Sequence, residues 1–127
     1  MNTKALLLEK RLNLFGADVA IATEVLPRNY FMEKLKEQLL RSCVSPALNY
    51  GEAQAAESRR DFIHKMKICL KELKETYNCI EIIEIYLTRK GISATVLESP
   101  KAEALELIKI FVSSINKVNL NPPTNTL

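Results

Sequence analysis

A row of basic side chains between residues 60 and 74 is the pattern with the clearest chemical potential in this sequence. Its members follow one another at intervals of four, three, four and three residues, so on a helix they fall within one narrow arc: Arg60, His64, Lys67, Lys71 and Lys74. Aligned cations of this kind can bind a run of nucleic acid phosphates. The pattern is equally typical of the solvated face of an amphipathic helix, and the spacing leaves both interpretations open.

The charge of the whole chain does not decide between them. Eighteen Lys and Arg stand against fifteen Asp and Glu, and a net charge of +3 is too small to indicate a nucleic acid partner. The surplus is unevenly distributed, however, because residues 59–74 hold six basic side chains and only two acids. This asymmetry is the best evidence in the sequence for an anionic partner.

A second row, polar and closely flanked by apolar residues, lies on the preceding helical stretch: Gln38, Arg41, Ser45, Asn49 and Glu52. Such groups are expected to be half buried and to need partners, since an unpaired buried polar atom costs about 1–3 kcal/mol. We interpret the row as a device that fixes helix register or a subunit contact. A nucleic acid or small-ligand site and plain solvated surface are the alternatives.

Residues for catalysis or metal binding are sparse. The three cysteines, Cys43, Cys69 and Cys79, lie in helical stretches without Cys-x-x-Cys spacing, and His64 is the only histidine. No zinc-ligand set and no Ser-His-Asp or Cys-His arrangement can therefore be assembled. We expect a non-enzymatic protein without a metal or cofactor, with its cysteines reduced and packed as small apolar side chains.

Neither an export signal nor a membrane span is predicted. The apolar run at the N-terminus is interrupted at once by Glu9, Lys10 and Arg11, and no uncharged stretch approaches the about 18 residues of a membrane helix. We expect a soluble cytoplasmic protein.

The first helix is predicted over residues 3–25 from a heptad seam formed by Leu8, Leu12, Phe15, Val19, Ala22 and Leu26. A second apolar flank, formed by Leu7, Leu14 and Ile21, indicates that this helix contacts two neighbours. Gly16 falls in mid-helix, a position suited to a close approach of another backbone.

The second helix is predicted over residues 30–56, with Asn29 as its cap and a kink or restart at Pro46. A capping box at Ser58 and Asp61 opens a third helix over residues 58–90, which Gly91 ends.

The fourth helix is predicted over residues 100–118, opened by Ser99 and Pro100. Its apolar stripe is expected to be Leu105, Ile108, Val112, Ile115 and Val118, widened by Leu107 and Phe111. Residues 1–118 would then form one bundle, and residues 119–127 a flexible tail.

The middle of the chain resembles the four-helix-bundle family of proteins encoded in 23S ribosomal RNA intervening sequences. The resemblance is carried by Gln38-Leu39-Leu40-Arg41-Ser42, Ser45-Pro46, Asn49-Tyr50, Gly51-Glu52-Ala53, Ser58, Asp61-Phe62-Ile63 and Lys71-Glu72-Leu73. It implies an antiparallel bundle that assembles into a ring-like homopentamer. It also implies kinship with the accessory variability protein of diversity-generating retroelements, which associates with a reverse transcriptase and nucleic acid.

These observations predict an all-α, up-down-up-down four-helix bundle that assembles with further copies of itself. Two functions stay open. One is an accessory protein that binds RNA or DNA through the basic row, with a protein partner such as a reverse transcriptase. The other is a structural or protein-interaction module without a nucleic acid role.

Overall fold

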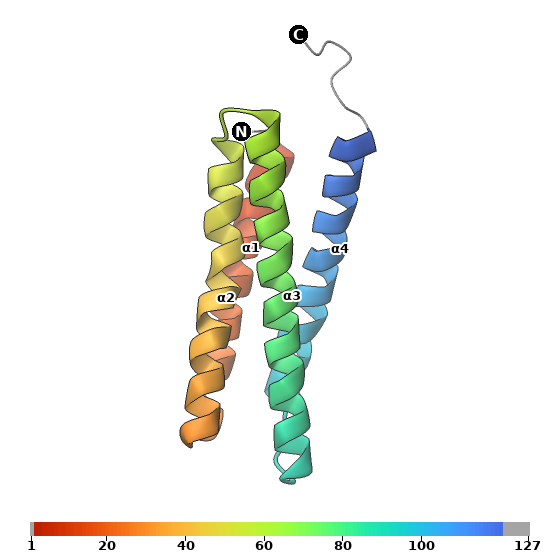
Figure 1. Cartoon of the computed structure of the whole chain (residues 1–127). Helices are drawn as coiled ribbons and strands as arrows, with labels where there is room; N and C mark the ends of the chain where they lie inside the picture. Colours follow the sequence, from red (N-terminus) through yellow and green to blue (C-terminus); the bar gives the residue numbers. More distant parts are fainter. Residues whose placement is uncertain (1, 121–127) are drawn as a thin grey trace.

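Four long helices joined by short connections make up nearly all of residues 2–120, the part of the chain that the computed structural model describes (Figure 1). The elements are α1 (Thr3–Thr23), α2 (Tyr30–Gln54), α3 (Arg59–Arg89), a 3₁₀ turn η1 (Thr95–Leu97) and α4 (Glu98–Leu120). The expected fourth helix thus begins at Glu98, and Ser99 and Pro100 lie in its first turn. Residues 121–127, most of the expected tail, lie outside the described part.

Consecutive helices run antiparallel and pack side by side (Figure 1). The most extensive contact is between α2 and α3, followed by α3 with α4 and α1 with α2, whereas α1 meets α4 over a smaller area. Short connections favour antiparallel neighbours. The prediction of an all-α four-helix bundle is confirmed, and residues 2–120 contain no β-strand.

Side chains and backbone geometry define both ends of α3 and the start of α2. Asn29 accepts a hydrogen bond from the Met32 amide at 2.9 Å, and Ser58 accepts one from the Asp61 amide at 3.0 Å, so each satisfies an amide left free by the first turn. Gly91, with φ of 71°, follows α3 in the left-handed conformation. The Ile92 amide then donates to the Leu87 carbonyl at 2.9 Å, which completes a Schellman motif.

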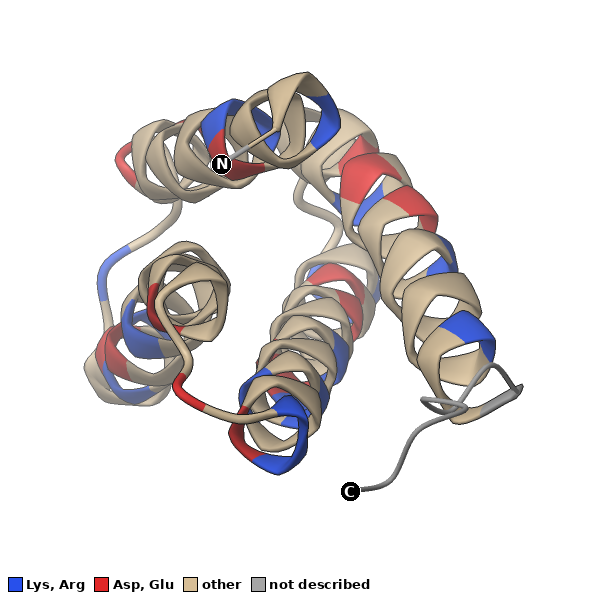
Figure 2. Cartoon of the chain, turned by 90° about the horizontal axis from the view of Figure 1, so that it is seen from above, with Lys and Arg blue, Asp and Glu red and all other residues tan. Residues whose placement is uncertain are grey.

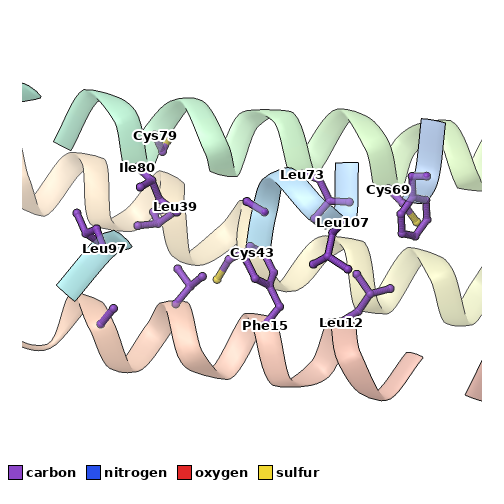
Figure 3. Close-up of a cluster of buried hydrophobic side chains, with 14 of the residues drawn as sticks. Leu12, Phe15, Leu39, Cys43, Cys69, Leu73, Cys79, Ile80, Leu97 and Leu107 are labelled. Atoms are coloured by element: carbon purple, nitrogen blue, oxygen red, sulfur yellow. The ribbon is translucent and has the colours of Figure 1, made fainter. Parts of the chain in front are cut away.

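The core runs along the bundle axis and draws on all four helices (Figure 3). Leu12 and Phe15 of α1 enter it from one side, while Leu39 of α2 and Leu73 and Ile80 of α3 enter it from others. The predicted seam of α1 is confirmed, with Leu12, Phe15, Val19, Ala22 and Leu26 buried and Leu8 half-buried.

The buried stripe of α4 matches the predicted one only in part. Leu107, Phe111 and Ile115 are buried together with Ala104, whereas Leu105 and Val112 are 40% and 38% exposed. The stripe is rotated because α4 carries apolar side chains on two faces. The small Ala104 and the large Phe111 fit the face toward the core, and Phe111 meets Tyr50 edge to face with ring centroids 5.7 Å apart.

Two positions inside helices reflect close packing. α2 continues through Pro46 without a restart, and the buried Pro46 carbonyl accepts from the Cys69 thiol at 3.4 Å. A Cβ placed on Gly16 of α1 would lie 3.2 Å from the Cys43 carbonyl oxygen of α2. The expectation of a close backbone approach at Gly16 is therefore confirmed.

The rotation of α4 can be tested with two adjacent residues. Phe111→Ala removes a ring that is 0% exposed and should lower the free energy of unfolding by about 3–5 kcal/mol. Val112→Ala, one position along, should change it by less than about 0.5 kcal/mol. Urea unfolding followed by circular dichroism measures both, and equal losses would contradict the observed burial.

Candidate nucleic-acid interface

All five members of the basic row project from the outer face of α3. Arg60, His64, Lys67, Lys71 and Lys74 are exposed, and none forms an ion pair within residues 2–120. They occupy an arc of about 80° on the side of α3 opposite its buried residues, and the row is about 21 Å long. We call these five residues the basic strip.

Lys and Arg occur on every helix of the bundle, with acids among them (Figure 2). Within residues 2–120 the basic strip therefore stands out by its alignment and its lack of ion pairs, in addition to the surplus of cations over residues 59–74.

Two of the acids that neighbour the strip in sequence, Glu72 and Glu75, are turned toward α2. Glu72, whose side chain is 10% exposed, accepts from Arg41 Nη1 at 3.0 Å, and Glu75 pairs with Nη2 of the same guanidinium. Hydrogen bonds to Glu75 and Glu72 raise the pKa of Arg41 above its ordinary value. Farther along α3, Glu84 pairs with Lys101 of α4 at 2.8 Å. These three carboxylates pair with cations of neighbouring helices and not with the strip.

The predicted polar row lies along the edge where α2 meets α3. Arg41 reaches Glu72 and Glu75, and Glu52 accepts from Lys65 of α3 at 2.6 Å. Asn49 and Ser45, both half-buried, bond to each other within α2 at 2.9 Å, and Gln38 is exposed. Two of the five side chains thus join α2 to α3 within one chain, and a role in subunit contact stays a prediction.

A buried hydroxyl pair beside this row was missed by the sequence reasoning. Thr76 Oγ1 donates to Ser42 Oγ at 2.9 Å, and both residues are 0% exposed. The available signal was a Ser and a Thr inside apolar helical stripes, where buried hydroxyls need partners. With Arg41 one residue before Ser42, the pair forms a polar contact that fixes the register of α2 against α3.

The strip borders one shallow hollow. Its volume is about 390 Å³, and it is lined by Ile63 together with Arg59, Arg60, His64 and Lys67. Arg59 itself bonds to the Val118 carbonyl of α4. Its lining comes from α3 alone, so the hollow adds surface relief to the strip and does not enclose a ligand.

Burial makes the cysteines poor nucleophiles. It raises the pKa of Cys69 to about 12 and that of Cys43 to about 11, and it also raises that of Cys79. The reactive thiolate is therefore disfavoured at neutral pH. Within the described part of the chain, no group of three or more His, Cys, Asp or Glu could hold a metal ion.

No helix among residues 2–120 is long and apolar enough to cross a membrane.

These features define an all-helical bundle whose candidate site is a charged surface. The chain belongs to the family described as 23S rRNA-intervening sequence protein, whose model matches residues 9–113. It is also similar to a crystal structure from Bacteroides thetaiotaomicron, described as a protein with unknown function from the S23 ribosomal protein family. That structure is 30% identical, with a TM-score of 0.72, and the match covers 90% of this chain and 99% of the other.

A comparison with curated proteins gave no match. Neither the family's description nor that of the solved structure names an enzymatic activity.

The Arg41 contacts can be tested by a double-mutant cycle. Arg41→Ala leaves the Glu72 carboxylate without its cation in a nearly buried position, so it should lower the urea midpoint of unfolding. Glu72→Gln in the same chain should recover part of the loss, because the charge that needed the cation is gone. Lys34→Ala removes an exposed cation of α2 and serves as the control. Strictly additive losses would contradict the pairing.

Proposed function

We propose that this protein is a non-enzymatic, self-associating accessory protein that binds nucleic acid through the basic strip of α3. The supporting observation is the strip itself, five exposed side chains in line without an acidic partner among the described residues. The family's description refers to a sequence within 23S ribosomal RNA. A reverse transcriptase is a candidate protein partner, by resemblance to the retroelement accessory proteins.

Self-association would raise the affinity of the basic strip for nucleic acid. A single row of four permanent cations and one histidine can neutralise only a few phosphates, so one chain should bind weakly at physiological salt. Several copies that present their strips to one nucleic acid would multiply the apparent affinity without a new contact. The family resemblance implies five copies in a ring.

The surface of α1 supports self-association. Leu7, Leu14 and Ile21, at intervals of seven residues, are 66%, 52% and 62% exposed and form one apolar row. On α2, Leu40, Val44 and Leu48 are also exposed. An apolar face of this extent is typical of a surface that is covered in an assembly.

The same apolar row favours a second candidate function. In this alternative the ring is a structural or protein-interaction module, its partner is another protein, and the basic strip is only a solvated face.

Reversing two charges of the strip distinguishes the two functions. Lys67→Glu with Lys71→Glu should weaken binding to mixed RNA and DNA fragments at least about tenfold at low salt, because two phosphate contacts become repulsive. The slope of log affinity against log salt should also become shallower. Fluorescence anisotropy across a salt series measures both.

The matched control is Lys34→Glu with Lys109→Glu, which changes the net charge equally at exposed positions of α2 and α4. It should retain most of the affinity. If wild type binds no fragment at low salt, the nucleic acid role is excluded and the interaction module remains.

Charges introduced into the α1 row should break the assembly. Leu14→Lys with Ile21→Lys is expected to reduce the mass seen by light scattering to that of one chain, with unchanged helicity because both side chains are exposed. Val112→Lys, an exposed apolar position on α4, should leave the mass unaltered. A double variant that keeps the wild-type mass would show that this row does not lie in the interface.

A further inference from the structure

The outer face of α3 continues beyond the basic strip with a different chemistry. Three- and four-residue intervals lead from Lys74 to Asn78, Ile82, Ile85 and Arg89. Ile82 and Ile85 are 46% and 48% exposed, although the same half of α3 supplies the core with Ile80, Ile83 and Leu87 at 0%. One continuous face is therefore basic over its first half and apolar over its second.

An aromatic pair borders the apolar half. Phe31 of α2, 41% exposed, lies against Tyr86 of α3 with ring centroids 4.7 Å apart and planes tilted by 35°. Asn29 Nδ2 donates to the Tyr86 hydroxyl at 3.3 Å, and Lys90 Nζ lies 5.2 Å from the centre of that ring. The half-buried Tyr86 ring is thereby held in place, with a cation over it.

The chemistry of the two halves matches two parts of one ligand. Cations in a row bind phosphates, while exposed aromatic and apolar side chains with a nearby cation bind the faces of nucleobases. We infer that a single-stranded nucleic acid lies lengthwise along α3, with phosphates on the basic strip and unpaired bases on Phe31, Tyr86, Ile82 and Ile85. This inference rests on the proposed function and specifies the class of its ligand.

A single strand fits this surface better than a duplex does. The basic strip is straight over about 21 Å, whereas a duplex strand winds around its axis and soon leaves a straight row. The bases of a duplex are also stacked on one another, while those of a single strand present their faces to aromatic side chains. A single strand can therefore use both halves of α3, whereas a duplex offers phosphates to the basic strip but no free base faces to the apolar half.

The test compares oligonucleotides with and without bases. A strand of about 12 nucleotides, its duplex and an abasic strand of equal length carry phosphates, but only the first offers free base faces. Wild type should bind the single strand at least about fivefold more tightly than the abasic strand, from the stacking of one base or more. RNA and DNA versions of each probe show which sugar is preferred.

The variant Phe31→Leu with Tyr86→Leu keeps apolar volume and removes the aromatic faces. It should bind the normal strand at least about fivefold more weakly, with an unchanged salt slope and unchanged affinity for the abasic strand. Tyr30→Leu, at an aromatic side chain that is 81% exposed one residue before Phe31, is the control and should bind as wild type does. Circular dichroism confirms that each variant is folded.

Equal binding of normal and abasic strands by wild type would overturn the inference, as would a duplex bound as tightly as the single strand. In either case, loss of binding in the Lys67 and Lys71 charge reversal would leave the proposed function standing. Failure of every probe to bind wild type at low salt would remove both.

Discussion

A nearly buried carboxylate at the α2–α3 contact needs a cation, and Arg41 provides it. Glu72 lies on the side of α3 that faces α2, where an unpaired charge would be costly. Arg41 also forms an ion pair with Glu75. One turn away, Thr76 and Ser42 close a hydrogen bond between the same helices. These contacts fix both the register and the rotation of α3, and with them the direction in which the basic strip points.

Much of the fold follows from local sequence. The seam of α1 repeats apolar residues so regularly that one face had to be buried. Asn29 and Ser58 cap the first turns of α2 and α3 through hydrogen bonds to the backbone, and Gly91 ends α3 in the left-handed conformation. The face of α4 could not be chosen in this way, because Leu105 and Val112 are as apolar as Leu107 and Phe111. Only the shape of the core, into which Phe111 fits beside Tyr50, selects between them.

In the candidate site, too, some features follow from local sequence and others depend on contacts between helices. The alignment of Arg60 through Lys74 follows from helical period alone, and their exposure follows from the apolar stripe opposite. The partners of Glu72 and Glu75 lie on another helix, more than thirty residues away in sequence, so periodicity gave no way to pair them with Arg41. The aromatic contact of Phe31 with Tyr86 likewise joins residues far apart in the chain.

The three buried thiols have a practical consequence. Cys79, Cys43 and Cys69 lie at successive heights along the bundle (Figure 3), and each is shielded by packing. A thiol reagent can reach each of them only when the helices around it separate, so the rate of labelling at each cysteine reports the opening of its own segment. Fraying from one end of the bundle would label the thiols in sequence along the axis. Cooperative unfolding would label all three together. The labelling rates of the three cysteines therefore distinguish fraying from cooperative unfolding.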